Sequence, residues 1–162
     1  MRIVGWNVNG LRACIKKGFI PFLQRSGADI VALQEVRAFP EQLPSQITES
    51  KDWHVSFSPA KRPGYSGVAI FSRVAPSKIE TSLGEARFDD EGRFIVAHFG
   101  RLAVASEAGQ ARIRKVGVVA PRSVVAFAVV TEPQYAAGAL QGRLDVVSER
   151  GGQVVLEKRR GG

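Results

Sequence analysis

Two apolar segments near the N-terminus, joined by a stretch with helical spacing, constrain the fold of this chain most. Residues 2–10 read RIVGWNVNG and residues 30–37 read IVALQEVR. Their β-branched runs end on polar or turn-forming residues and predict strands from Ile3 to Val8 and from Asp29 to Gln34. Between them a helix is predicted from about Phe19 to Ser26. Because the second strand is apolar on both faces, we expect a sheet covered on both sides, which indicates an α/β fold.

The rest of the chain is also rich in strand patterns. After a loop with a short helical turn at residues 38–50, five strands are predicted: Trp53 to Ser58, Gly67 to Ser72, Lys78 to Ser82, Arg93 to His98 and Leu102 to Ser106. Beyond residue 106 the chain becomes rich in Val, Ala and Gly, and the predicted strands are Val116 to Ala120, Val124 to Val130, Leu144 to Ser148 and Gln153 to Lys158. A chain of 162 residues has the length of one domain. We therefore expect residues 107–162 to complete, as a divergent segment, the domain that residues 1–106 begin.

Net charge and apolar patterning narrow the class of protein. The chain has 23 Lys and Arg against 15 Asp and Glu, a formal charge of +8, which is expected to attract polyanions such as nucleic acid; a generic basic surface explains it equally well. No apolar run approaches the roughly 18 residues that span a bilayer, and no basic and apolar leader precedes the first strand, so a cytoplasmic protein without membrane contact is expected. The single cysteine, Cys14, is expected to be a packed residue without a chemical role.

The candidate chemistry lies where the first two predicted strands end. Asn7 and Asn9 stand at the end of the first strand and Glu35 at the end of the second. Consecutive strands are usually neighbours, so the amide and the carboxylate should project into one pocket. The Glu35 carboxylate suits Mg²⁺, and Asn7 could hold a metal-bound water or a phosphate oxygen. The structural alternative is that Glu35 caps a helix or pairs with Arg37, while Asn7 supports a turn.

Basic and aromatic residues surround these positions in the sequence. Arg12, Arg37, Lys61 and Arg62 each lie near a predicted loop and could contact backbone phosphates, and Tyr65 offers a stacking surface. Taken singly, each such charge is more often a solvated surface group.

Four motifs together resemble the exodeoxyribonuclease III and apurinic/apyrimidinic (AP) endonuclease family of the endonuclease/exonuclease/phosphatase superfamily. They are GWNVNGLRA, ADIVALQEVR, PAKRPGYSGVAIFSR and FDDEGRFIVAHF, which occur in the order and at intervals similar to those of the family, over residues 1–106. The resemblance implies an α/β (α+β) fold, a partial sandwich of two packed sheets flanked by helices. It also implies Mg²⁺- or Mn²⁺-dependent hydrolysis of phosphodiesters in double-stranded DNA, at abasic sites and at 3′ ends.

The resemblance implies roles for individual residues. Glu35 matches the metal-binding glutamate of the family, and Asn7 matches the asparagine that orients metal and phosphate, so both are expected in the catalytic and metal site. Asn9 aligns with a second polar position near the metal. The remaining matches fall where the family meets DNA or shapes its cleft: Arg12, Arg37 and Tyr65.

The chain departs from the family after Ser106. The family continues with a tyrosine-bearing loop, an Asp-x-Asn motif that activates water and a final Ser-Asp-His motif, and none of these is present. Both histidines, His54 and His98, are expected to be structural rather than general bases. The simplest hypothesis is a truncated member of the family whose last third was replaced, with catalysis weak or absent.

Three functions are therefore weighed. The first is a Mg²⁺-dependent DNA repair nuclease of exodeoxyribonuclease III type, with activity impaired by the lost motifs. The second is a non-catalytic DNA-binding fragment held by the basic loops. The third keeps the superfamily but changes the substrate to a phosphoinositide or sphingomyelin head group, and the matches at Arg12, Arg37 and Tyr65 favour DNA over it.

Overall fold

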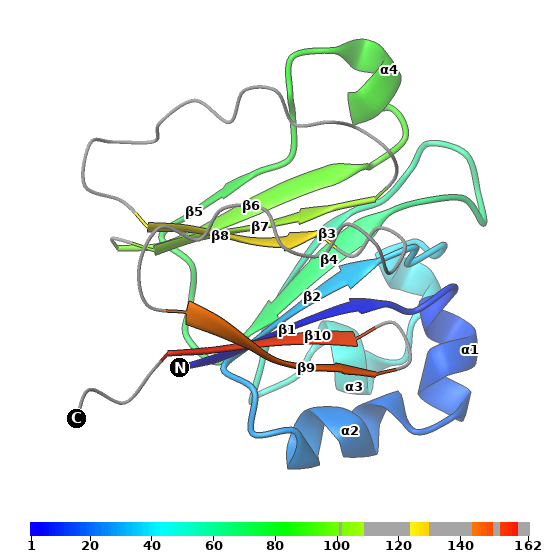
Figure 1. The fold of residues 1–162 in the computed structure, drawn as a ribbon. Coiled ribbons are helices and arrows are strands. Elements are labelled where there is room, and N and C mark those ends of the chain that lie inside the picture. Colours follow the sequence, from blue (N-terminus) through cyan, green and yellow to red (C-terminus); the bar gives the residue numbers. More distant parts are fainter. Residues whose placement is uncertain (101, 109–123, 130–143, 151–152, 159–162) are drawn as a thin grey trace.

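The computed structural model describes residues 1–100, 102–108, 124–129, 144–150 and 153–158, which form two β-sheets and several short helices (Figure 1). The helices are α1 (Leu11–Lys16), α2 (Phe19–Arg25), α3 (Ser45–Thr48) and α4 (Ala86–Asp89), with a 3-10 turn η1 (Pro40–Gln42). The strands are β1 (Arg2–Asn7), β2 (Ile30–Gln34), β3 (His54–Ser58), β4 (Val68–Ser72), β5 (Lys78–Glu80), β6 (Phe94–Phe99), β7 (Leu102–Glu107), β8 (Val124–Val129), β9 (Leu144–Arg150) and β10 (Gln153–Lys158).

The larger sheet has the strand order β3-β4-β2-β1-β10-β9. Its centre is the parallel pair β1 and β2, in which Ile3 lies opposite Ile30 and Asn7 lies opposite Gln34. Strand β4 runs antiparallel to β2, and β10 runs antiparallel to β1 on the other side. The first two predicted strands are thus neighbours, as expected for consecutive strands joined by helices.

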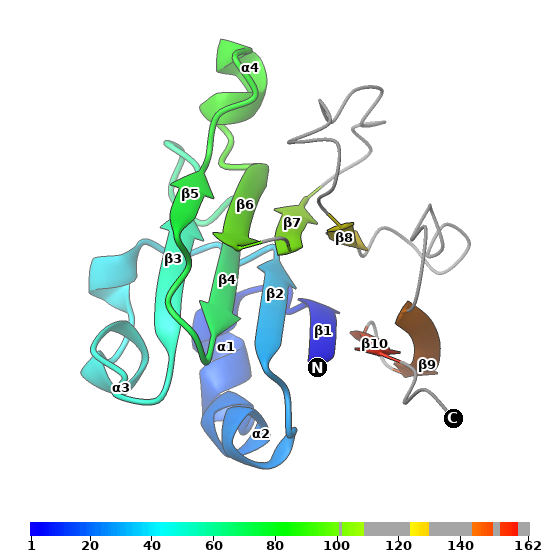
Figure 2. The same ribbon diagram turned by 90° about the vertical axis from the view of Figure 1, so that its left-hand side faces the viewer.

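The smaller sheet has the order β5-β6-β7-β8 and packs against the larger one, so that the two sheets form separate layers in Figure 2. The core between them joins Ile30, Ala32 and Ile70 of the larger sheet to Ile95 and Val104 of the smaller. These residues sit at alternate positions of their strands, because successive side chains of a strand point to opposite faces. The two-sheet sandwich expected from the family resemblance is therefore present.

The other face of the larger sheet is covered by helices α1 to α3. Val31 and Leu33, which alternate with the residues of the first core, pack into a second core with Phe19 of α2 and Phe71 of β4. The Phe19 and Phe71 rings lie 5.6 Å apart in an edge-on arrangement, which aromatic pairs favour. All five residues of β2 are buried, so the prediction of a strand covered on both faces is confirmed.

Most predicted elements are found within one or two residues of their predicted ends. Helix α2 and strands β1 to β7 match, as do β8, β9 and β10 beyond residue 106, whereas the strand predicted at 116–120 lies outside the described residues. Two short helices, α1 and α4, were not predicted. Helix α1 follows Gly10, which has no side chain to cap it, and has no acidic residue in its first turn, so it lacks the usual signals of a helix start. None of the described helices has the length and apolar character needed to cross a bilayer.

Candidate active site at the carboxyl ends of strands β1 and β2

The two central strands bring their predicted polar residues to the same edge of the sheet. Asn7 lies opposite Gln34, and Glu35 follows directly. The loops after both strands continue side by side, since the backbone N–H of Gly10 donates to the Glu35 carbonyl at 2.7 Å and that of Leu11 donates to Val36 at 2.9 Å. The segment after β1 is therefore held against the segment that carries Glu35.

A third loop, which precedes β4, completes this edge. The backbone N–H of Arg37 donates to the Ser66 carbonyl at 2.8 Å. Four non-glycine residues of these three loops have positive φ angles: 45° at Asn9, 53° at Glu35, 50° at Arg37 and 43° at Ser66. Each such conformation costs on the order of 1–3 kcal/mol and persists only where surrounding structure enforces it, which makes this edge a candidate functional site.

The side chains of Glu35 and Asn7 have local partners. The Arg37 Nε donates to Glu35 Oε2 at 3.0 Å, and the Glu35 side chain is 22% exposed. The Asn7 Oδ1 accepts a hydrogen bond from the Asn9 backbone N–H at 3.1 Å. Because a backbone N–H can only donate, this bond assigns the amide oxygen of Asn7 to the turn and leaves its NH₂ group as a donor. Both contacts of the structural alternative, the ion pair and the turn, are therefore present.

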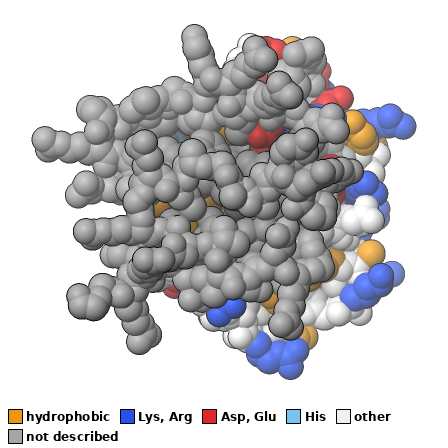
Figure 3. Space-filling model, in the orientation of Figure 1, with side chains coloured by type: hydrophobic (Ala, Val, Ile, Leu, Met, Phe, Trp, Pro, Cys, Tyr) orange, Lys and Arg blue, Asp and Glu red, His pale blue; other side chains and the backbone are white. Residues whose placement is uncertain are grey.

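A pocket of about 640 Å³ adjoins these loops, and the residues around it come from α1, the loop after β2 and the loop before β4. Its lining residues are Gly10, Arg12, Ala13, Ile15, Lys16, Arg37, Gln42, Pro44 and Gly64. The lining contains three cations and no carboxylate, so it suits an anionic group. Figure 3 shows Lys and Arg side chains projecting along the edge that carries α1. The predicted residues Arg12 and Arg37 thus share one pocket, together with Lys16, which the sequence reading missed because it did not predict α1.

The other three predicted DNA-contact residues lie on the loop at residues 59–67, between β3 and β4. Lys61 forms an ion pair with Asp90, its Nζ 2.7 Å from Oδ1. The guanidinium carbon of Arg62 lies 5.6 Å from the centre of the Tyr65 ring. Since Gly64 of the same loop lines the pocket, the loop is its neighbour. The structure therefore places Lys61, Arg62 and Tyr65 beside the pocket but not in its lining.

Two charged residues near the site had no predicted role. Arg93 donates from Nη2 to the Tyr65 hydroxyl at 2.8 Å; burial disfavours its charge, but Glu91, Tyr65 and Glu35 outweigh burial and raise its pKa. Glu107, at the end of β7, is 1% exposed, and among the residues that the structure describes its Oε1 has no hydrogen-bond partner. Burial raises the pKa of Glu107 to about 7, although the charge of Arg93 opposes the shift. In the sequence, Arg93 was noted only as part of the motif FDDEGRFIVAHF, which assigned it no role. Glu107 lies in none of the four motifs, so no local pattern identified it.

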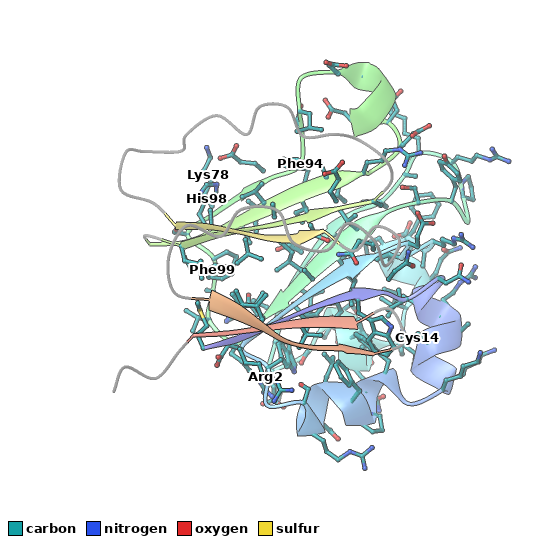
Figure 4. The ribbon with its side chains drawn as sticks, viewed as in Figure 1. Arg2, Cys14, Lys78, Phe94, His98 and Phe99 are labelled. Atoms are coloured by element: carbon teal, nitrogen blue, oxygen red, sulfur yellow. The ribbon has the colours of Figure 1, made fainter. Side chains whose placement is uncertain are left out.

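The two histidines lie away from this edge, whereas the cysteine, Cys14, is a buried residue of α1. His54 lies opposite Ser72, which lies opposite Ile30 at the start of β2, so His54 is at the far end of the strands from Glu35. His98 lies 3.0 Å from Glu80, close to Lys78 and far from the carboxyl end of β1 (Figure 4). Burial raises the pKa of the Cys14 thiol, an effect that the charge of Lys17 opposes. The expectation that these residues are structural agrees with these positions.

A metal ion at this edge would depend on one carboxylate, that of Glu35. Within the described residues no group of three or more His, Cys, Asp or Glu side chains could hold a metal ion. Mg²⁺ is nevertheless commonly bound by one or two carboxylates together with waters and substrate phosphates. The Glu35 carboxylate and the remaining lone pair of the Asn7 oxygen fit such a sparse site.

Two packed sheets, helices on the outer face of the larger sheet and a polar site where two parallel strands end define a two-layer α/β class of protein. The model of the endonuclease/exonuclease/phosphatase family matches residues 4–150, so the chain belongs to this family. The match extends beyond residue 106, where the resemblance seen in the sequence ends.

Curated relatives share sequence with about two thirds of the chain. The exodeoxyribonuclease of Bacillus subtilis (strain 168) is 38% identical over 105 residues, which are 64% of this chain and 40% of that protein. The DNA repair nuclease APEX1 of Danio rerio is 36% identical over 101 residues, which are 61% of this chain and 33% of that protein. The chain therefore spans less than half the length of these DNA-processing nucleases.

Solved structures agree in fold. A 3′ phosphatase from Neisseria, solved with a product DNA hairpin, superposes with a TM-score of 0.56 at 30% identity, over 65% of this chain and 40% of that one. An AP endonuclease from Archaeoglobus fulgidus has a TM-score of 0.56 at 30% identity, over 65% and 39%. The fold of the chain is thus that of the endonuclease/exonuclease/phosphatase family, as the sequence predicted.

Proposed function

We propose that this protein binds double-stranded DNA at the edge formed by β1 and β2 and hydrolyses its phosphodiester bonds, at abasic sites or 3′ ends, with Mg²⁺ or Mn²⁺ as cofactor. One observation carries the proposal: Asn7 and Glu35 lie at the same end of two paired strands, beside a pocket lined by three cations, in a chain whose relatives include an exodeoxyribonuclease and a DNA repair nuclease. A cytoplasmic location remains part of the proposal.

Different residues of the chain would bind the phosphate and the metal ion. Arg12, Lys16 and Arg37 neutralise a phosphate in the pocket, and the NH₂ group of Asn7 donates to a phosphate oxygen. Glu35 holds the metal ion, which when bound would stabilise the charge that develops on the phosphate. This assignment gives Asn7 the task of a phosphate donor rather than a strong metal ligand, because its oxygen already accepts from Asn9.

Activation of water is the weakest part of this site. The chain contains no Asp-x-Asn and no Ser-Asp-His sequence, and both of its asparagines lie before residue 10. Hydrolysis without a positioned base loses on the order of 10²–10⁴-fold in rate. We therefore expect slow turnover compared with full-length relatives.

Cleavage of a duplex that contains one abasic site tests the proposal. The protein is incubated with the duplex and Mg²⁺ or Mn²⁺, with EDTA as the control for metal dependence. Glu35→Gln should abolish cleavage, whereas Glu41→Gln, an exposed glutamate on η1, should leave the rate unchanged. Equal cleavage by the wild type and Glu35→Gln would refute the role of Glu35.

The absence of the Asp-x-Asn and Ser-Asp-His motifs from the sequence favours a second candidate, a DNA-binding fragment without chemistry. In that case the duplex is bound in a salt-sensitive manner, binding survives both EDTA and Glu35→Gln, and no strand is cut. The same samples, examined by gel shift and by denaturing gel, distinguish this function from the first.

A further inference from the structure

The turn at residues 90–93, before β6, is docked onto the loop at residues 59–67. The backbone N–H of Lys61 donates to the Asp90 carbonyl at 2.8 Å, and the side chains of the same two residues form an ion pair. The loop is thus fixed at its first part by both backbone and side chain.

Gly92 brings the two segments into direct contact. A Cβ atom at Gly92 would lie 2.4 Å from the Ser58 carbonyl oxygen and 2.4 Å from the carbonyl carbon of Pro59. The absence of a side chain therefore allows the backbone of the turn to lie against the backbone at the end of β3.

Arg93 connects the turn to the second part of the loop. Its guanidinium donates in three directions: from Nη2 to the Tyr65 hydroxyl at 2.8 Å, from Nη1 to the Ala108 carbonyl at 2.9 Å and from Nε to the Glu91 carboxylate. Its side chain is 20% exposed. Because a guanidinium is rigid and planar, the bonds to Ala108 and Glu91 fix the direction of the bond to Tyr65.

We propose that Arg93 is a positioning residue for duplex binding: it holds Tyr65, and with it the loop at residues 59–67, in the arrangement that meets DNA. The inference rests on the proposed DNA binding and adds a residue to it. Tyr65 is 36% exposed and can stack while its hydroxyl stays bound to Arg93. A surface that is fixed in advance binds more tightly, because less conformational entropy is lost on binding.

Duplex affinity in a double-mutant cycle tests the coupling. Tyr65→Phe and Arg93→Met should each weaken binding about threefold to tenfold, the loss typical of one hydrogen bond, and the double variant should bind no more weakly than Arg93→Met. Arg73→Met removes an arginine that lies 4.1 Å from the Trp53 ring, outside the pocket lining, and should leave the affinity unchanged. Additive losses would overturn the proposal.

Salt dependence separates positioning from direct phosphate contact. If Arg93 acts through Tyr65, Arg93→Met and Tyr65→Phe leave the slope of log K against log salt unchanged. A slope reduced by about 1 in Arg93→Met alone would show that Arg93 itself binds a phosphate, and would overturn the positioning role.

A measurement without DNA keeps the two proposals distinct. Endoproteinase Lys-C cuts after Lys61, and mass spectrometry follows that product. Arg93→Met should accelerate this cut severalfold and Tyr65→Phe to a smaller degree, with Arg73→Met unchanged; equal rates in all would overturn the inference. A wild type that binds no duplex would refute the proposed function alone. If circular dichroism shows that Arg93→Met is unfolded, the conclusion rests on Tyr65→Phe, whose duplex affinity and rate of Lys-C cleavage are compared with those of the wild type.

Discussion

The guanidinium of Arg37 pairs with the carboxylate of Glu35 at 3.0 Å, although only one residue separates them in the chain. Both residues have positive φ angles, 53° at Glu35 and 50° at Arg37, and the backbone N–H of Arg37 is bound to the Ser66 carbonyl. The conformation of this short segment therefore sets the direction of the carboxylate. It also places a cation where a metal ion would have to compete with it.

Removal of this competing cation should strengthen metal binding. In Arg37→Gln the Glu35 carboxylate loses a partly exposed ion pair, whose worth is at most about 1 kcal/mol, so the affinity for Mg²⁺ should rise up to about fivefold. Isothermal titration calorimetry with MgCl₂ measures this. Arg12→Gln, which changes the same pocket without touching the pair, is the matched control and should leave Mg²⁺ affinity nearly unchanged. Weaker Mg²⁺ binding in Arg37→Gln would contradict the expectation.

Ionisation of Glu107 should make stability fall as pH rises. Its pKa is about 7 in the folded protein, compared with an ordinary value of 4.5. Below pH 4.5 both states are protonated; between pH 4.5 and 7 only the unfolded state loses its proton, so folding becomes less favourable by about 3 kcal/mol in total. Glu107→Gln cannot ionise, and its advantage over the wild type should grow from near zero at pH 4.5 to about 3 kcal/mol at pH 8.

Urea unfolding at pH 4.5, 6 and 8 measures the effect of Glu107→Gln. The exposed variant Glu49→Gln serves as the control, because its environment differs little between the folded and unfolded states. A difference between Glu107→Gln and the wild type that does not vary with pH would show that the carboxyl does not titrate in this range.

A buried hydrogen-bond chain joins the two sheets at the site edge. Gln34 donates from Nε2 to Ser106 Oγ at 2.8 Å, and the Ser106 hydroxyl donates to the Leu33 carbonyl at 3.0 Å. Ser106→Ala leaves the Gln34 donor without this acceptor and should destabilise the protein by about 1–3 kcal/mol. Chemical denaturation with Ser45→Ala, an exposed serine, as control measures the loss; equal stability of the two variants would contradict it.

Gly92 and Gly100 have nearly the same φ angle but different surroundings. Substituting each by alanine therefore distinguishes the cost of a steric clash from the cost of an unfavourable backbone conformation. Gly92 has φ of 57°, and a Cβ there would lie 2.4 Å from the carbonyl carbon of Pro59; Gly100 has φ of 60°, and a Cβ there would meet no atom of the described residues within 4 Å. Gly100→Ala should cost about 1 kcal/mol from its positive φ, and Gly92→Ala about 1–3 kcal/mol more because the loop at residues 59–67 must shift. Thermal unfolding of both variants tests this, and equal melting temperatures would argue against the close contact.

Local patterns in the sequence were enough for the elements of the sandwich. The apolar run Ile30–Gln34 predicted a strand buried on both faces, and it is fully buried between helices and the second sheet. Helix α1 escaped prediction because its six residues carry no cap and its stability comes from packing of Leu11 and Cys14 against the sheet.

The position of the candidate residues along the chain came from the sequence. The expectation that Asn7 and Glu35 lie at one edge came from it too, because consecutive strands usually pair; their contacts with other segments came from tertiary structure. Asn7 and Glu35 were recognisable as polar residues at the ends of apolar strands, because the apolar pattern of a strand indicates its burial. That Arg93 reaches Tyr65 and that Ser106 meets Gln34 depends on contacts between distant segments. Such contacts form only when the sheets pack, because their free energy comes from partners that no local pattern contains.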